Sequence, residues 1–192
     1  LTQAINYYNQ NKSDIPFIKT TSTKKYTLIL DLDKTLINVE FMDHTIVSNL
    51  RPGIFSFLNA IKPLYELISF TTSSKEYSDT IIQKIEARKK YFDFNLYRDH
   101  SFLLGREFIK DISRIGRDIK RMIIVDNMAN NYKLNKENGI NICPFYGESK
   151  GDTVLFELKK LLIMFHKKGD DDLRKSIKEY EEEIKKKITC VN

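Results

Sequence analysis

The sequence contains no tryptophan and only two cysteines among its 192 residues. Cys143 and Cys190 lack the spacing of metal ligands, so we expect reduced thiols in a reducing compartment. No glycine-rich loop of the P-loop type occurs, so a nucleoside triphosphate is not an obvious ligand. The apolar runs are far too short to cross a bilayer, and no membrane segment is expected in this chain. Because the chain starts at Leu1, an anchor or targeting segment in a longer parent stays open.

Charge and aromatic content indicate a globular protein with a mildly basic surface. Hydrophobic residues make up 41% and charged residues 30% of the chain, and the net charge is +6. A chain of this length forms one domain of ordinary size with a full core. The lysines are scattered and no basic and aromatic residues interleave, which favours a solvated surface over a nucleic-acid site. We therefore expect no direct contact with nucleic acid.

The most informative stretch is an apolar run that ends in two carboxylates, Asp31 and Asp33. Residues 26–30 are rich in β-forming side chains and indicate a buried strand of a parallel sheet. Alternate residues share one face of a strand, and ligands of open α/β sheets bind beyond the strands' carboxyl ends. Acidic pairs there hold a hard divalent cation or divide nucleophilic and acid-base work. Simple capping would explain one aspartate better than this pair followed by Thr35.

Strands and helices alternate along the rest of the chain. The further strands expected from apolar runs are 64–70, 94–97, 121–125 and 140–143. Residues 37–50 have the length of one hairpin or a loop. This alternation favours a parallel α/β sheet covered on both faces.

Helix starts are indicated by capping residues and by proline. Pro52 would stand at an early position of the first helix. The hydroxyl residues 71–74 precede the second helix; we interpret Ser73 and Ser74 as simple caps, while Thr71 fits capping and function about equally. Asp152 and Thr153 would cap a third helix. Tyr7, Tyr8, Ile15 and Phe17 would attach the polar segment before residue 26 to the body.

Polar groups at the expected strand ends point to one reaction. In chain order they are Asp31 and Asp33, Thr71, Arg98, Lys110 on a loop, and Asp126 with Asn127. Carboxylate and amide oxygens hold Mg²⁺, while a cation and a hydroxyl stabilise charge on phosphoryl oxygens. These residue types together favour phosphoryl transfer.

Several segments resemble the FCP/SCP-type (NLI-interacting-factor-like) phosphatases of the haloacid dehalogenase (HAD) superfamily. Residues 31–36 (DLDKTL) look like its DxDxT motif, and 70–72, 96–99, 108–113 and 124–127 follow in the family's order. The resemblance implies an α/β, three-layer HAD-like (Rossmann-like) fold with a central, mainly parallel sheet, helices on both faces and a minimal cap. The organisation expected is a polar extension (1–25), the phosphatase domain (26–168) and a charged amphipathic helix (169–192).

The resemblance also implies a role for each matched residue. Asp31 would be the nucleophile that forms an aspartyl-phosphate, and Asp33 the general acid and base. Asp31, the Asp33 carbonyl and Asn127 would hold Mg²⁺, with Asp126 helping the metal or Lys110.

The substrate contacts implied are Thr71, Thr72, Arg98, Lys110, Phe41 and Tyr77. Thr71 and Lys110 would hold the phosphoryl oxygens. Arg98 fits a structural ion pair nearly as well, and the two aromatic residues could equally belong to the core. Thr72 replaces an expected alanine, a change that should be tolerable.

The substrate implied is a phosphorylated protein or peptide, either the RNA polymerase II C-terminal domain or another phosphoprotein. The segment between Phe41 and Arg51 is shorter than the insert of polymerase-directed members, so peptide specificity stays open. An import-receptor-like or scaffold binding module on the same fold is the alternative, and a small-molecule phosphatase is disfavoured because sequence for a cap domain is lacking. We expect a monomer in the nucleus or cytoplasm, with a mitochondrial or membrane-tethered parent still open.

Overall fold

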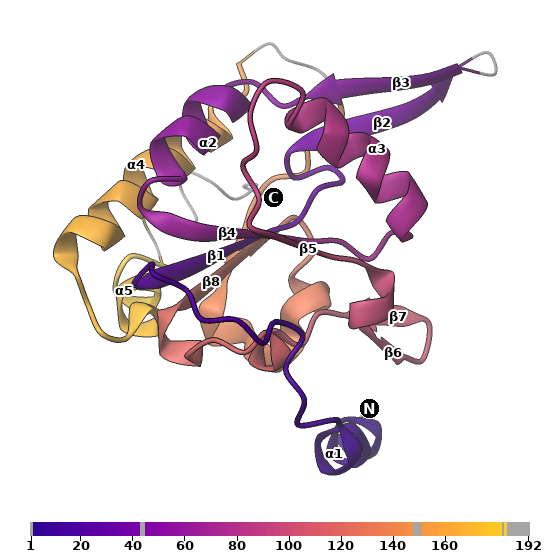
Figure 1. Cartoon of the computed structure of the whole chain (residues 1–192), viewed down its shortest axis with the longest axis vertical. Helices are drawn as coiled ribbons and strands as arrows, with labels where there is room; N and C mark the ends of the chain where they lie inside the picture. Colours follow the sequence, from indigo (N-terminus) through magenta and orange to yellow (C-terminus); the bar gives the residue numbers. More distant parts are fainter. Residues whose placement is uncertain (1, 43–44, 148–150, 182, 184–192) are drawn as a thin grey trace.

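A computed structural model describes residues 2–42, 45–147, 151–181 and 183 (Figure 1). Its centre is a five-stranded sheet in the order β5-β4-β1-β8-β9, with every neighbouring pair parallel. The strands are β1 (Tyr26–Leu30), β4 (Tyr65–Phe70), β5 (Phe94–Leu96), β8 (Met122–Asp126) and β9 (Gly139–Asn141). All five coincide with expected strands to within two residues at each end.

The strand order places a topological switch beside β1. The chain runs from β1 to β4 and β5 on one side and then to β8 and β9 on the other. Because the strands are parallel, their carboxyl ends share one edge of the sheet, and ligands of such sheets bind at this kind of switch point. Asp31, Thr71 and Asn127 each follow a strand at that edge.

The α-helices that follow residue 50 contribute to one apolar cluster. They are α2 (Ile54–Ile61), α3 (Lys75–Ile85), α4 (Val154–Lys168) and α5 (Leu173–Glu179). Phe57 and Leu162 pack in this cluster with Leu28, Leu30 and Val125 of the sheet, all without exposed surface. Figure 1 shows α2 and α4 side by side, and the two helices are in contact.

A second apolar cluster covers the opposite face with shorter elements. The short helices that surround this face are η2 (Ile112–Arg114), η3 (Ile119–Arg121) and η4 (Ala129–Asn138). Ile112 and Tyr132 pack there on Ile29 and Ile124, joined by Ile18 from the N-terminal segment. The expected fold class with both faces covered is confirmed, although 3₁₀ helices and an extended segment form this second layer.

Two hairpins and one short helix accompany the sheet. The hairpin of β2 (Ile37–Met42) and β3 (Thr45–Leu50) directly follows the loop of residues 31–36, here called the aspartate loop. In Figure 1 the hairpin extends past α3. A hairpin was one of the two structures expected for residues 37–50, the other being a loop. A second hairpin of β6 (Phe102–Leu104) and β7 (Glu107–Ile109), preceded by η1 (Arg98–His100), was not expected. Its second strand ends one residue before Lys110.

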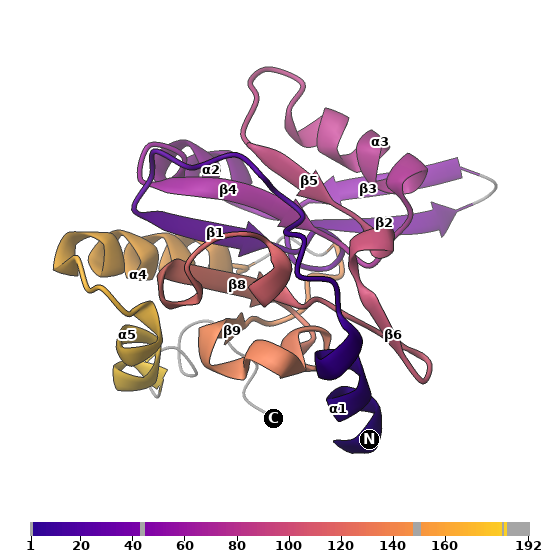
Figure 2. The ribbon, with the colours of Figure 1, turned by 60° about the horizontal axis from the view of Figure 1, so that its bottom comes forward.

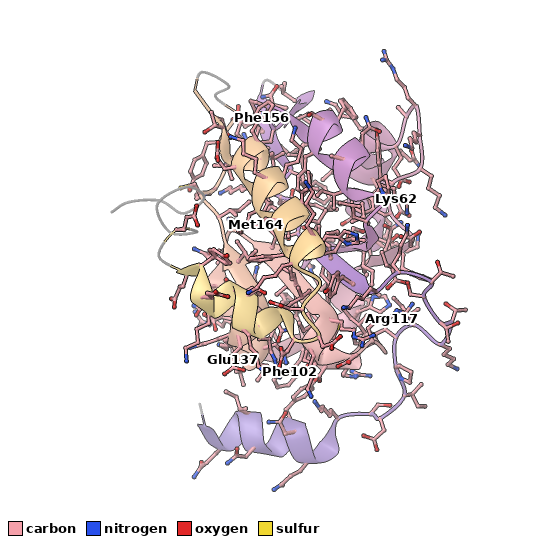
Figure 3. The ribbon with its side chains drawn as sticks, turned by 90° about the vertical axis from the view of Figure 1, so that its left-hand side faces the viewer. Lys62, Phe102, Arg117, Glu137, Phe156 and Met164 are labelled. Atoms are coloured by element: carbon pink, nitrogen blue, oxygen red, sulfur yellow. The ribbon has the colours of Figure 1, made fainter. Side chains whose placement is uncertain are left out.

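Helix α1 (Thr2–Asn11) was not expected, and it lies beside the β6–β7 hairpin (Figure 2). The Tyr8 ring stacks on Phe102 with 3.9 Å between ring centroids, and Figure 3 shows Phe102 on the side of the body that faces α1. The Tyr8 hydroxyl and the Lys12 ammonium both donate to Asp111 Oδ2 at 3.1 Å. Tyr8 and Phe17 therefore do attach the segment, but Ile15 is 62% exposed and does not.

Helix boundaries differ from expectation at two places. Gly53, with φ of 81°, is the N-cap of α2, so Pro52 precedes the helix instead of standing inside it. At α4, Asp152 Oδ1 accepts a hydrogen bond from the Val154 amide, whereas the N-cap Thr153 makes no side-chain capping bond. Gly169 ends α4 with φ of 73°.

The C-terminal part of the chain was expected to form one amphipathic helix. Leu173 and Ile177 of α5 are buried against the body, while Ile184 and Ile188 lie outside the described residues. No helix among the described residues is both long enough and apolar enough to span a bilayer.

The cysteines were expected to be reduced thiols. Cys143 is disulfide-bonded, so this expectation is wrong, and with it the argument from cysteine for a reducing compartment. Cys190 lies outside the described residues.

Candidate active site

Three buried charges meet at the carboxyl edge beside β1. Lys110 Nζ lies 2.7 Å from Asp31 Oδ1 and 2.7 Å from Asp126 Oδ2. Lys110 and Asp126 have no exposed surface, and Asp31 is 5% exposed. The Asp31 amide is fixed by a 3.0 Å hydrogen bond to the Val125 carbonyl, which places the first aspartate at the switch point. The structure thus brings together three residues predicted from separate segments.

The charges of this cluster do not balance. Two carboxylates face one ammonium, and each is removed from water. Burial and the charge of Asp126 raise the pKa of Asp31 to about 7, against the opposing effect of Lys110 and of the Thr35 hydrogen bond. Burial acts to lower the pKa of the Lys110 ammonium, but the charges of Asp126 and Asp31 and their hydrogen bonds together raise that pKa above its ordinary value. One additional positive charge would stabilise both carboxylates in their ionised form.

Thr35 connects Asp31 with Asn127. The buried Thr35 hydroxyl donates to Asp31 Oδ2 at 2.9 Å and lies 3.4 Å from Asn127 Oδ1. A carboxylate oxygen and an amide oxygen therefore reach the same hydroxyl. These are hard oxygen donors of the type that Mg²⁺ prefers, and they fit the expected ligand set. Among the described residues, no three or more His, Cys, Asp or Glu side chains form a cluster suited to a metal. The expected Mg²⁺ ligands do not require such a cluster, because they include the Asp33 carbonyl and the Asn127 amide.

The loop that carries these groups folds back on one carbonyl. The amides of Thr35, Leu36 and Ile37 all donate to the Leu32 carbonyl at 2.9–3.2 Å. Lys34 adopts the left-handed conformation with φ of 58°, the only non-glycine residue in the described chain with positive φ. This tight turn places the Thr35 hydroxyl back over Asp31.

Asp33 belongs to a second network, with α3. Ser73 Oγ donates to Asp33 Oδ2 at 2.9 Å, and the Tyr77 hydroxyl donates to Asp33 Oδ1 at 2.7 Å. Burial and the neighbouring Asp33 raise the pKa of Tyr77, so its phenol remains a donor. Ser74 is the N-cap of α3 and makes no side-chain capping bond. The expected cap position is therefore confirmed for Ser74, although its side chain makes no capping bond, and the interpretation of Ser73 as a simple cap is wrong because its hydroxyl bonds Asp33.

The remaining predicted contacts lie around the end of β4. Thr71 is 1% exposed, and its hydroxyl oxygen accepts a 3.1 Å hydrogen bond from the Ser73 amide. Exposed Arg98 donates from Nε to the Thr72 carbonyl at 2.8 Å and lies 5.1 Å from the Phe108 ring centroid. Its hydrogen bond and its ring contact are thus with a carbonyl and an aromatic side chain. The side chain of Phe41 lies outside the described part of the structure.

Arg51 was not identified from the sequence, and it supports the aspartate loop through the backbone carbonyl of Thr35. Arg51 is 1% exposed, donates from Nη1 to the Thr35 carbonyl at 3.2 Å and pairs through Nε with Asp152 at 3.0 Å. Its guanidinium carbon lies 5.7 Å from the Phe145 ring centroid. An arginine directly before Pro52 gave no signal of burial, because its partner lies about a hundred residues away in the sequence.

The fold and sequence have clear relatives. The fission yeast RNA polymerase II CTD phosphatase Fcp1 bound to beryllium fluoride has a TM-score of 0.55 and 19% identity, over 100% of this chain and 61% of that chain. At that identity the likeness concerns the fold, which is HAD-like.

Curated relatives differ in what their names describe. CTD small phosphatase-like protein 3 of Caenorhabditis elegans is 31% identical over 170 residues, which cover 80% of this chain and 59% of that protein. The mitochondrial import inner membrane translocase subunit TIM50 of Candida glabrata is 30% identical over 155 residues, 80% of this chain and 32% of that protein. This chain therefore spans less than two thirds of either relative.

A family model described as NLI interacting factor-like phosphatase matches residues 26–174. The match starts at the first residue of β1 and ends within α5, so it contains the whole cluster of Asp31, Lys110 and Asp126. The chain belongs to the NLI interacting factor-like phosphatase family.

Proposed function

We propose that this chain is a Mg²⁺-dependent phosphatase that hydrolyses phosphoserine or phosphothreonine in a protein, through an aspartyl-phosphate on Asp31. One observation carries the proposal: the buried Asp31–Lys110–Asp126 network at the switch point, joined to Asn127 through Thr35. A buried ammonium between two carboxylates is costly unless each charge has a partner. Its position at the ligand-binding edge favours a catalytic purpose.

The first step transfers the phosphoryl group to the protein. An Asp31 oxygen attacks phosphorus, the bond from phosphorus to the serine or threonine oxygen breaks, and Asp33 gives its proton to that oxygen. Lys110 and the Thr71 hydroxyl hold the phosphoryl oxygens. The Thr71 hydroxyl suits this task because its oxygen accepts from the Ser73 amide, which leaves its proton to be donated elsewhere.

The second step releases phosphate. Water attacks phosphorus, Asp33 takes a proton from that water, and the bond from phosphorus to Asp31 breaks. The products are inorganic phosphate and the original Asp31 carboxylate, with Asp33 protonated again for the next cycle.

Asp31, the Asp33 carbonyl and Asn127 would hold Mg²⁺, and Asp126 would support the metal or Lys110. When bound, the ion supplies positive charge that shields phosphate from the approaching carboxylate. The excess of negative charge in the buried cluster and the convergence of Asp31 and Asn127 oxygens on Thr35 support this assignment.

A protein substrate is supported by the small size of the elements at the active edge. Within the described residues, the insertions between sheet strands are the two-stranded hairpin β2–β3, between β1 and β4, and the two-stranded hairpin β6–β7, between β5 and β8; neither amounts to a cap domain. An open edge admits a loop or peptide more readily than it encloses a metabolite. Arg98, Thr72, Phe41 and the ring of Tyr77 are the proposed contacts to the substrate. The RNA polymerase II C-terminal domain is one phosphoprotein in this class.

A binding module is the second candidate, because a translocase subunit is nearly as similar to this chain as a phosphatase-like protein. The presence of Asp31, Asp33, Thr71, Lys110, Asp126 and Asn127 in one chain argues against a role in binding alone. Catalysis is therefore the better-supported reading.

Hydrolysis of p-nitrophenyl phosphate tests the proposal, with and without Mg²⁺, in the natural chain and in Asp31→Asn. We expect turnover that requires Mg²⁺ and is lost in the variant. Turnover that persists without metal or with Asp31→Asn would contradict the mechanism. A folded chain inactive toward aryl phosphates and phosphopeptides alike would favour the binding module.

A further inference from the structure

Ser73 contacts two residues that have different roles in the proposed reaction. Its amide donates to the Thr71 hydroxyl oxygen at 3.1 Å, and its hydroxyl donates to Asp33 Oδ2 at 2.9 Å. Thr71 is the proposed phosphate ligand and Asp33 the proposed acid and base. A single residue on the loop between β4 and α3 thus adjoins the group that holds phosphate and the group that moves the proton.

Tyr77, one turn into α3, completes the arrangement. Its hydroxyl reaches the other oxygen of the same carboxylate, Asp33 Oδ1, at 2.7 Å. One hydroxyl comes from the loop before α3 and the other from the first turn of α3, and they bind two oxygens of one side chain, which fixes the torsion of the carboxylate plane as well as its position. A single hydrogen bond would leave this plane free to turn, because the terminal torsion of aspartate is broad.

We propose that Ser73 and Tyr77 are positioning residues that hold the Asp33 carboxyl group in line with the leaving oxygen of the substrate. The inference rests on the proposed phosphatase function and on the role of Asp33 in it. Both hydroxyls donate to Asp33, and a hydroxyl can donate to a lone pair of a carboxyl oxygen whether the group is ionised or protonated. This pair of hydrogen bonds, the clamp, therefore persists through both protonation states of Asp33 and leaves the acid proton free for the leaving oxygen.

Neither hydroxyl is explained by the stability of α3 alone. Ser74, not Ser73, occupies the N-cap, and that side chain makes no capping bond. The Ser78 hydroxyl meanwhile bonds the Ser74 carbonyl, so the first turn of the helix has its own side-chain contact. Ser73 and Tyr77 point across to the aspartate loop, which links the position of α3 to the geometry of Asp33.

The dependence of the rate on the leaving group tests this inference. A general acid matters most when the departing oxygen is strongly basic and least when it is a good leaving group. The probes are substituted phenyl phosphates with increasing phenol pKa, and a phosphoserine peptide as the most basic case. For Ser73→Ala and Tyr77→Phe we expect kcat/KM, which reports the first step and not the shared second step, to fall by about 10-fold or more on the peptide but only about 2-fold on p-nitrophenyl phosphate, within the 100- to 10,000-fold typical of acid catalysis.

Matched variants separate positioning from folding. Ser74→Ala removes the neighbouring hydroxyl, which makes no capping bond, and Tyr91→Phe removes a phenol that bonds Asn59 far from the site. Both should keep the natural dependence on the leaving group. Ser73→Thr, which restores a hydroxyl, should recover most of the activity that Ser73→Ala loses. If Ser73→Ala does not fold, Tyr77→Phe carries the same test.

The outcomes distinguish this inference from the function on which it rests. A steeper dependence on leaving-group pKa in Ser73→Ala or Tyr77→Phe supports the clamp. An equal loss on all substrates, or no loss, overturns the clamp while the phosphatase stands. A natural chain that hydrolyses none of the probes overturns both.

Discussion

Lys110 and Asp126 form an ion pair with 2.7 Å between Nζ and Oδ2, and neither side chain has any exposed surface. The same ammonium holds Asp31 at 2.7 Å. A fully buried ammonium such as that of Lys110 is tolerated only while its carboxylate partners remain ionised and in contact with it. This edge of the sheet is therefore part of the core of the protein, and the proposed catalysis would depend on the same side chains as folding.

Lys110→Met should destabilise the protein strongly. The substitution keeps most of the side-chain volume but leaves two buried carboxylates without a counter-ion, at a cost of about 3–5 kcal/mol in the free energy of unfolding. Urea denaturation measures this change. Lys160→Met removes a 70% exposed ammonium on α4 and should shift stability by less than about 1 kcal/mol. Equal effects of the two substitutions would contradict the burial of Lys110.

Arg51 and Asp152 should be energetically coupled. The guanidinium is buried and connects Asp152 with the carbonyl of Thr35. In a double-mutant cycle with Arg51→Met and Asp152→Asn, we expect a coupling energy of about 0.5–3 kcal/mol, the range for groups in one network. Thermal unfolding of the four proteins gives the value. Additive effects would mean that the pair contributes nothing to the loop.

Thr35→Val should impair metal activation more than folding. The variant keeps the shape of the side chain but removes the hydroxyl that orients Asp31 and adjoins Asn127. Loss of a group that orients metal ligands typically lowers affinity or activity about 10- to 100-fold. A titration of phosphatase activity with Mg²⁺ should show a higher midpoint than for the natural chain. Thr153→Val, whose hydroxyl makes no capping bond, is the control, and an unchanged midpoint in Thr35→Val would count against the ligand set.

Tyr8→Ala should loosen α1 without unfolding the domain. The helix depends on the stack with Phe102 and on hydrogen bonds to Asp111. A stack of this kind contributes about 0.5–1.5 kcal/mol, so cleavage between residues 12 and 17 should speed up by about 2- to 10-fold in limited proteolysis. Asn9→Ala, on an exposed position of the same helix, should change little. Unaltered cleavage of Tyr8→Ala would show that other contacts hold α1.

The sheet was predictable because its strands are short apolar runs with clear ends. Leu28, Ile68 and Ile124 lie in strands without exposed surface, and such positions tolerate few other side chains. The residues at the strand ends were identified for the same reason: an Asp or Thr directly after a buried strand is conspicuous. The pattern indicates where these residues lie, and the parallel order then brings Asp31 near Asp126.

Elements held by contacts distant in sequence were missed. The polar residues of α1 show no helical period, and the helix is attached through Tyr8 to Phe102 and Asp111, about a hundred residues away. The β6–β7 hairpin has strands of three residues each, too short for an alternating pattern to register. Ser73 was interpreted as a cap because sequence shows only its neighbours, not Asp33, which lies 40 residues earlier in the chain.

The most direct measurement is the site of phosphoryl transfer. The natural chain and Asp33→Asn are mixed with p-nitrophenyl phosphate and Mg²⁺ and quenched in acid, and the phosphorylated peptide is located by mass spectrometry. The account predicts a phosphoryl group on Asp31, enriched in Asp33→Asn because the second step lacks its base, and absent in Asp31→Asn. A phosphoryl group on another residue, or steady turnover with none trapped on Asp31 in either protein, would contradict it.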